Sequence, residues 1–168
     1  MEKLENDVLS DENVPKPILW RRYVDDTFCL WDQSDDDLNL FLSKLNNYHK
    51  DIKFTVEKEC NKSLPFLDVM CKRNVSNIET SVYRKPTSTF RLLDANSNHS
   101  WAQREGVIKT LTNRALNVCS SEDSKKEELN LLRKIFKSNG YSPYTIKKAM
   151  NSVITKRTAS SVEDLQFE

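Results

Sequence analysis

The stretch RRYVDDTFCLW, residues 21–31, places two adjacent carboxylates, Asp25 and Asp26, between two apolar runs. Both runs are rich in aromatic and β-branched residues, so they predict two short strands joined as a hairpin at the Asp pair. Two-residue hairpin turns favour Gly or Asn where φ is positive, which makes Asp-Asp a poor choice for turn geometry alone. Either the pair is a solvated turn, or it holds a cation, for which oxygen ligands favour Mg²⁺.

The next segment, residues 35–50, predicts a helix with one apolar face, because its apolar residues recur at helical spacing. That face is formed by Leu38, Phe41, Leu42 and Leu45. We expect it to pack against the hairpin and to become buried, while Asp25 remains accessible to solvent.

Residues 52–59 alternate as a strand should, and residues 64–84 predict a second hairpin with an NVSN turn. After residue 86 the pattern is helical. One apolar stripe consists of Trp101, Ile108, Leu111, Ala115 and Val118. Ser124 and Glu127 have capping-box spacing.

Two further dipeptides mark helix ends. Asn139-Gly140 is typical of a helix C-terminus, and Ser142-Pro143 of the start of the next helix. Two helices joined by a short turn that contains Gly have the outline of a helix-turn-helix.

These patterns predict an α+β fold in four parts. Residues 1–15 are polar and are expected to be a disordered lead-in, residues 16–86 hold the hairpins and the first helix, residues 87–157 are all-helical, and residues 158–168 are expected to be a disordered tail.

The charge is unevenly distributed along the chain. Residues 1–60 carry a net charge of −6, whereas residues 61–168 carry +7. A basic half next to an acidic half indicates a polyanion partner for the former and a cation site in the latter, although a solvated helical surface has a similar imbalance. No apolar run is long enough to span a membrane, and the acidic N-terminus has no apolar core of a signal peptide. We therefore expect no membrane partner and an intracellular location, nuclear or cytoplasmic.

Tyr23-Val24-Asp25-Asp26 resembles the Y-x-D-D signature of reverse transcriptases, the RNA-directed DNA polymerases. The blocks LPFLDVMCKR, SVYRKPTSTFRLL, NSNHS, TLTNRAL and NGYSPYTIKKA, in this order, resemble those of the Penelope-like retroelements (retrotransposons). The likeness spans about residues 18–150. It implies that residues 16–86 are the C-terminal part of a polymerase palm and that residues 87–157 are a thumb-like, helix-turn-helix-like subdomain.

The resemblance also implies roles for single residues. Asp25 and Asp26 would be the catalytic metal ligands for Mg²⁺, with Tyr23 and Val24 at the primer terminus. Phe66 and Leu67 would lie in the primer grip, for which core packing is the alternative.

Basic residues would meet a phosphate backbone, because such contacts need cations and donors rather than base readout. They are Arg84 and Lys85 after the second hairpin, and Lys147 and Lys148 on the polar face of the last helix. That face also carries Asn151 and Thr155. An exposed strand end and a solvated helix face are the respective alternatives.

The palm of the family carries a further metal-bridging Asp and fingers upstream, which the residues before Asp25 do not resemble. We therefore expect a truncated enzyme that binds Mg²⁺ weakly and is inactive alone, with an RNA/DNA duplex as its sequence-nonspecific partner. A non-catalytic nucleic-acid-binding helix-turn-helix module and a protein-interaction domain are the alternative functions.

Overall fold

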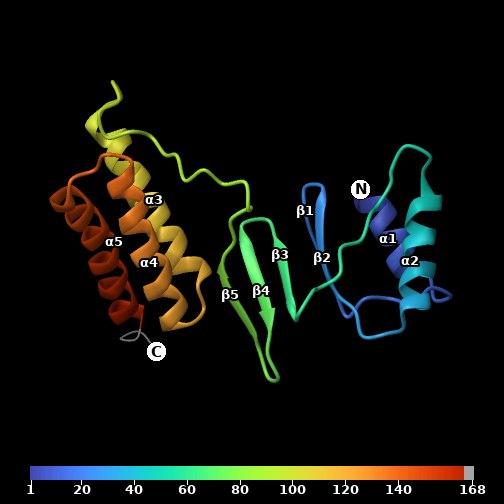
Figure 1. The fold of residues 1–168 in the computed structure, drawn as a ribbon. Coiled ribbons are helices and arrows are strands. Elements are labelled where there is room, and N and C mark those ends of the chain that lie inside the picture. Colours follow the sequence, from blue (N-terminus) through green and yellow to red (C-terminus); the bar gives the residue numbers. More distant parts are fainter. Residues whose placement is uncertain (165–168) are drawn as a thin grey trace. The chain divides into compact units, whose positions relative to one another are not determined.

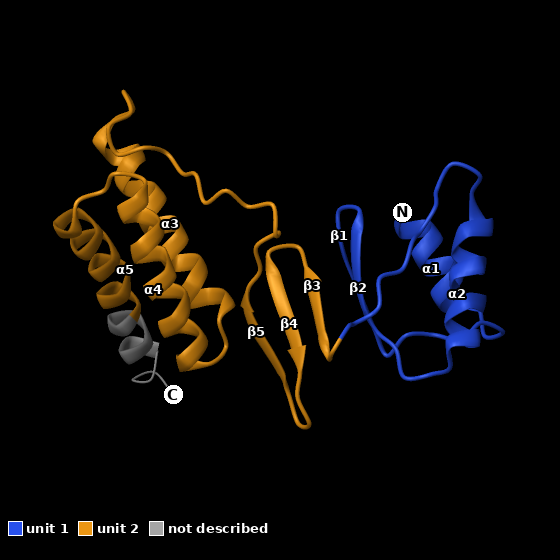
Figure 2. Cartoon of the chain, viewed as in Figure 1, with its two compact units in different colours: residues 1–60 blue, residues 61–168 orange. Residues whose placement is uncertain are grey.

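The structure is a computed structural model that describes residues 1–164, with side chains of the last helix described as far as Arg157. These residues form two small antiparallel sheets and five helices, with a helical C-terminal half (Figure 1). The predicted α+β class is confirmed. The chain divides into two compact units, Met1–Cys60 and Asn61–Glu168, each considered by itself below (Figure 2).

Unit 1 contains a hairpin and two helices: α1 (Glu2–Ser10), β1 (Leu19–Tyr23), β2 (Asp26–Leu30) and α2 (Asp35–Tyr48). Ser34 caps α2 by accepting a hydrogen bond from the Asp37 backbone nitrogen at 3.1 Å. The indole of Trp20 packs edge-on against Phe41, with ring centroids 5.6 Å apart. The hairpin therefore packs on the apolar face of α2, as predicted.

Most of the expected core of α2 is buried. Leu38, Phe41 and Leu45 are buried, whereas Leu42 is only half-buried. Leu42 lies at the edge of the helix face that the hairpin covers, so the predicted face is one residue too wide.

The predicted disordered lead-in is wrong for residues 2–10, which form α1. Leu4 and Val8, one helical turn apart, are buried in the core of unit 1. The Glu5 carboxylate accepts hydrogen bonds from the Trp20 indole at 3.0 Å and from Arg22 at 2.7 Å. Tertiary contacts of three side chains stabilise a helix whose own polar composition does not predict it.

The expected strand at residues 52–59 is not formed. Instead, the Asn46 side chain bonds both backbone groups of Phe54: its Oδ1 accepts from the Phe54 N–H at 2.6 Å, and its Nδ2 donates to the Phe54 carbonyl at 3.1 Å. A side chain of α2 thus takes the place of a partner strand, and the Phe54 ring packs near Trp20.

Unit 2 begins with a three-stranded sheet rather than a simple hairpin. Its strands are β3 (Ser63–Phe66), β4 (Val69–Arg73) and β5 (Ile78–Val82), in the order β3-β4-β5. The register pairs Phe66 with Val69, so Leu67 and Asp68 form a two-residue turn within the expected first arm. Leu67 has a φ of 52°. No Gly, Asn or Pro marks this turn, which explains why the sequence pattern does not reveal it.

The helical part of unit 2 contains α3 (Trp101–Val118), α4 (Glu122–Ser138) and α5 (Pro143–Asp164). All three pack against one another around a core that includes Ile108, Leu132, Phe136 and Met150. Full burial of such a side chain contributes about 2 kcal/mol. The core therefore fixes which faces of α3 and α5 remain at the surface.

The helix ends agree in part with prediction. Asn139 caps α4 and Gly140 has a φ of 84°, and Ser142 accepts a hydrogen bond from the Thr145 backbone at 3.2 Å. The cap of α4 is Ser121, one turn before the predicted Ser124. Helix α5 continues through 158–164, which were expected to be disordered, while residues 165–168 of that predicted tail lie outside the described residues.

The division between the units also differs from the predicted change after residue 86. Strand β5 is joined to the helices by Thr80, whose Oγ1 donates to the Val118 carbonyl at 2.6 Å and whose N–H donates to Ser120 Oγ at 2.9 Å. These long-range bonds place the β3–β5 sheet with the helical bundle.

Candidate nucleic-acid interface

The β1–β2 turn is exposed. Register pairing of Tyr23 with Asp26 leaves Val24 and Asp25 as its two central residues, one position before the predicted junction. Tyr23 and Val24 are 62% and 65% exposed, and both Asp side chains are exposed. Val24 has a φ of 53°, which is an outlier for a β-branched residue.

The two carboxylates do not by themselves fit a two-metal site. Asp25 and Asp26 lie on one turn, and no group of three or more His, Cys, Asp or Glu among residues 1–164 is placed to hold a metal ion. Such a site clamps the attacking and leaving oxygens with ions that several carboxylates hold.

The β3–β4 turn presents Phe66 half-buried and Leu67 44% exposed. Its Asp68 is tied to α3: Arg114 lies 3.3 Å from Asp68 Oδ2 and bonds the Tyr83 carbonyl at 3.3 Å. The Tyr83 N–H donates to the Asp68 carbonyl at 2.8 Å. Phe66 and Leu67 therefore belong to the junction between the sheet and the helices.

Arg84 and Lys85 differ in their surroundings. Both terminal nitrogens of Arg84 bond the buried carboxylate of Glu128 on α4, a bidentate pair. The hydrogen bonds to Glu128 raise the pKa of Arg84 above its ordinary value. Lys85 is exposed. Arg84 thus has a structural partner, and its contact with phosphate stays a prediction.

The exposed face of α5 carries the remaining predicted contacts. Its opposite face is buried through Ile146, Ala149, Met150 and Val153. The helical period therefore turns outward Tyr144, Lys147, Lys148, Asn151 and Thr155, all of which are exposed. Lys147 and Lys148 lie on one polar helix face, as expected.

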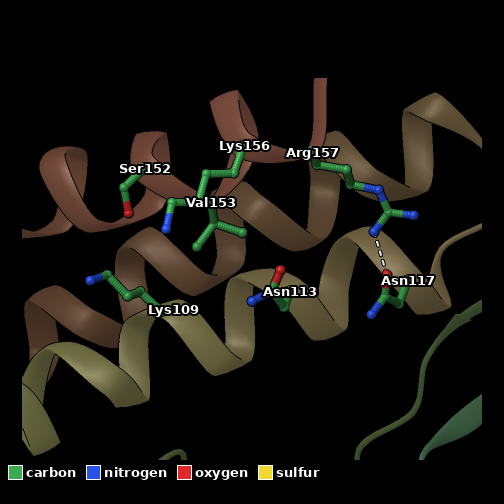
Figure 3. Close-up of a pocket in the computed structure, with 7 residues that line it drawn as sticks. All are labelled: Lys109, Asn113, Asn117, Ser152, Val153, Lys156 and Arg157. Carbon is green, nitrogen blue, oxygen red and sulfur yellow. Dashed lines mark hydrogen bonds between the residues drawn. The ribbon is translucent and has the colours of Figure 1, made fainter. Parts of the chain in front are cut away.

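A groove of about 690 Å³ lies beside this face, between α3 and α5 (Figure 3). On α3, Lys109, Asn113 and Asn117 form one row at four-residue spacing. The α5 wall is formed by Ser152, Val153, Lys156 and Arg157. Arg157 donates a hydrogen bond to the Asn117 side chain, and Lys109 is paired with Glu105 at 3.2 Å.

The groove continues the exposed face of α5. Lys148, Ser152 and Lys156 follow one another at four-residue spacing, so they lie in one row along the helix. Across the groove, the α3 row of Lys109, Asn113 and Asn117 faces Ser152 and Lys156 of α5 (Figure 3). The sequence patterns did not predict this site. The polar row of α3 was visible in the sequence, but only the packing of α5 against α3 gives it a partner row.

Residues 91–151 match the family model described as an animal helix-turn-helix domain. The match covers the segment before α3, the whole of α3 and α4, and the first part of α5. It confirms the predicted helix-turn-helix at this end of the chain. No curated protein and no solved structure matches the chain. Among the described residues, no helix combines the length and the hydrophobicity that a bilayer crossing requires.

Proposed function

We propose that the helical part of unit 2 is a nucleic-acid-binding module that meets the phosphate backbone of a duplex with α5 and the α3–α5 groove. The match of residues 91–151 to a helix-turn-helix family carries this proposal. It is supported by the net charge of +7 over residues 61–168 and by the cations that α5 turns outward.

The chemistry of the two rows suits a backbone rather than base edges. Lysines supply charge, and Asn and Ser supply uncharged donors, which are the groups that contact phosphate oxygens. Binding of this kind releases counterions, so it is independent of sequence and falls with salt.

The test is the affinity of the full chain for a labelled duplex as a function of salt concentration. We expect a log–log slope of roughly −0.9 for each B-DNA phosphate that is neutralised. Lys147→Glu and Lys148→Glu should weaken binding of all duplex sequences alike. Lys72→Glu is the matched control, because Lys72 is exposed on β4 and its reversal changes the net charge equally. Salt-independent binding, or equal losses in all three variants, would rule out the α5 surface.

A second candidate function follows from the strained turn of β1–β2. We propose that unit 1 carries the Y-x-D-D hairpin of a retroelement reverse transcriptase, as the resemblance implies. Val24 at a φ of 53° supports this, since backbone outliers cluster at functional sites. The exposed carboxylates of Asp25 and Asp26 are consistent with it.

A two-metal site needs more carboxylate ligands than the two that this hairpin supplies. Two carboxylates on one turn do not clamp two metal ions, so the chain by itself should not extend a primer on an RNA template. The assay is Mg²⁺-dependent incorporation of deoxynucleotides by the chain and by Asp25→Asn. Extension that Asp25→Asn abolishes would show that another carboxylate completes the site, and Asp11, Asp32 and Asp68 would be the first to mutate.

A further inference from the structure

We infer that the end of the helical bundle around Phe90 and Trp101 binds unpaired nucleotides by stacking their bases. The inference rests on the proposed duplex-binding function and adds a second class of nucleic-acid structure to it. Phe90 and Trp101 belong neither to the duplex surface nor to the Y-x-D-D hairpin.

Three large aromatic side chains are exposed at this end. Phe90 is 41% exposed, Trp101 53% and Tyr144 74%. The sequence pattern placed Trp101 in the apolar stripe of α3, yet it is the first residue of the helix and remains exposed. Single exposed apolar residues are common on protein surfaces, but several large ones near one another are typical of a binding surface.

A series of hydrogen bonds links the chain segments that carry Phe90 and Trp101. Arg104 donates to the Ala95 carbonyl, and the Ala95 N–H donates to the Asn139 carbonyl at 3.0 Å. The Asn139 side chain then donates to the Phe90 carbonyl at 2.9 Å. Trp101 adjoins this path because the Arg104 guanidinium lies 5.7 Å from the centre of its ring.

Phe90 is held in place at a conformational cost. Its φ of 54° lies in the left-handed region, which a bulky residue rarely adopts. Asn139 fixes this segment from both sides, because its Oδ1 also accepts from the Leu92 N–H at 2.8 Å. The ring therefore remains partly exposed on an anchored backbone, as a pre-formed binding surface requires.

The charges around the rings favour nucleotides over an apolar peptide. The Arg104 cation already lies over the Trp101 ring, exposed Arg91 follows Phe90 directly, and exposed Lys147 lies one helical turn after Tyr144. Asp94 is the acidic residue between Phe90 and Trp101. Its carboxylate accepts a hydrogen bond from the Asn96 N–H at 2.7 Å. Aromatic faces with flanking cations bind single strands by stacking on any base while the cations meet the phosphates.

Tyr144 links this surface to the duplex surface. It lies on the first turn of α5, one turn before Lys147 and Lys148 on the exposed face. A duplex on α5 would thus have its unpaired end directed to the aromatic residues. The preferred ligand is a duplex with a single-stranded extension.

The experiment compares three labelled probes with the full chain: a blunt duplex, the same duplex with a short unpaired extension, and the extension alone. We expect the extension to strengthen binding, and Trp101→Leu to reduce that gain by about 5- to 150-fold, the range for loss of one base–aromatic stack. Leu keeps apolar area but has no π face. Trp101→Phe should retain most of the gain, and Phe90→Leu should reduce it.

Leu131→Ala is the control, since Leu131 is exposed on α4 away from the aromatic residues. It should leave all three affinities unchanged. The inference is overturned if the extension adds nothing, or if Trp101→Leu binds the extended duplex as tightly as the unaltered chain. Either result leaves the proposed function intact where the blunt duplex still binds and Lys148→Glu weakens it. Loss of blunt-duplex binding in the unaltered chain would instead overturn the proposed function.

Discussion

The β1–β2 and β3–β4 hairpins each turn on two residues, Val24-Asp25 and Leu67-Asp68, and in both turns the aliphatic residue has a positive φ. Type II′ turns have this pattern, with Gly preferred at that position. Each sheet is also held by an arginine that pairs with a helix glutamate: Arg22 with Glu5, and Arg84 with Glu128.

The two turns differ in the contacts of their Asp residues. Asp68 is tied to Arg114 and to the backbone of Tyr83. In the β1–β2 turn, Arg22 bonds the Val24 carbonyl at 3.2 Å, but the carboxylate of Asp25 makes no hydrogen bond or ion pair with a described residue. The same backbone conformation is thus bonded to a helix residue in one turn and not in the other. The comparison makes the exposed turn the better candidate for a functional site.

The largest effect is expected at the arginine pair of unit 2. Glu128→Ala removes the partner of a largely buried guanidinium and should lower the free energy of unfolding by about 3–5 kcal/mol. Glu127→Ala, at an exposed position on the same helix, controls for the change in helix propensity. Urea denaturation followed by circular dichroism measures both. Equal losses in the two variants would show that the pair does not anchor the sheet.

The corresponding pair of unit 1 should respond to acid. Burial of Glu5 raises its pKa, but hydrogen bonds from Arg22 and Trp20 outweigh burial and hold the pKa below its ordinary value of 4.5. A lowered pKa in the folded state stabilises the fold above pH 4.5, and this stability is lost as the pH falls below that value. Glu5→Gln should cost about 1.5 kcal/mol at neutral pH and flatten the acid response. Urea titrations of both variants at neutral pH and below pH 4.5 test this. An acid response that Glu5→Gln leaves unchanged would contradict it.

Glycine at the two turns should relieve their strain. The left-handed conformation costs an ordinary residue about 1–2 kcal/mol. Gly avoids this cost, but it loses more backbone entropy on folding, which offsets about 0.5–1 kcal/mol of the gain. Val24→Gly and Leu67→Gly should therefore each stabilise the chain by about 0.5–1 kcal/mol. Val75→Gly is the control, because Val75 is fully exposed without a positive φ and should be destabilised. Destabilisation by Val24→Gly would mean that the exposed turn is unstrained.

The smallest effects separate the two Asp residues. Asp68→Asn should cost about 0.5 kcal/mol, the value of a partly exposed ion pair, and this loss should shrink at high salt. Asp25→Asn should leave stability unchanged within error. Thermal melts at two salt concentrations distinguish these outcomes. A stability loss in Asp25→Asn equal to that of Asp68→Asn would remove the distinction between the turns.

Local sequence patterns predicted the structure correctly where tertiary packing agrees with local preference. The face of α2 was predicted because Leu38, Phe41 and Leu45 repeat at helical spacing, and the end of α4 because Asn139-Gly140 has one preferred geometry. The β1–β2 hairpin followed from aromatic and β-branched runs. In each case a few neighbouring residues determine the outcome.

Features that depend on distant residues could not be predicted. Helix α1 is stabilised by contacts of Glu5 with Trp20 and Arg22, and the Leu67-Asp68 turn is held by Arg114, which lies 46 residues further along the chain. The α3–α5 groove needs two helices about 40 residues apart in sequence to pack together. Trp101 matched the periodicity of α3 but lies beyond the ends of its neighbours. These outcomes depend on tertiary contacts, which helical and strand periodicity does not reveal.

Asn139 has a chemical consequence beyond its role in the fold. An Asn followed by Gly is prone to deamidation, in which the next backbone nitrogen attacks the side-chain amide and ammonia leaves. In the folded chain, the Asn139 amide donates to Phe90 and Ile135, and the Gly140 N–H is bonded to the Lys137 carbonyl at 3.1 Å. Deamidation therefore requires local opening at the end of α4. Once aspartate forms there, it lacks the donor that holds Phe90 and places a negative charge at a helix C-terminus. The same side chain that orders the aromatic surface thus makes this surface sensitive to deamidation.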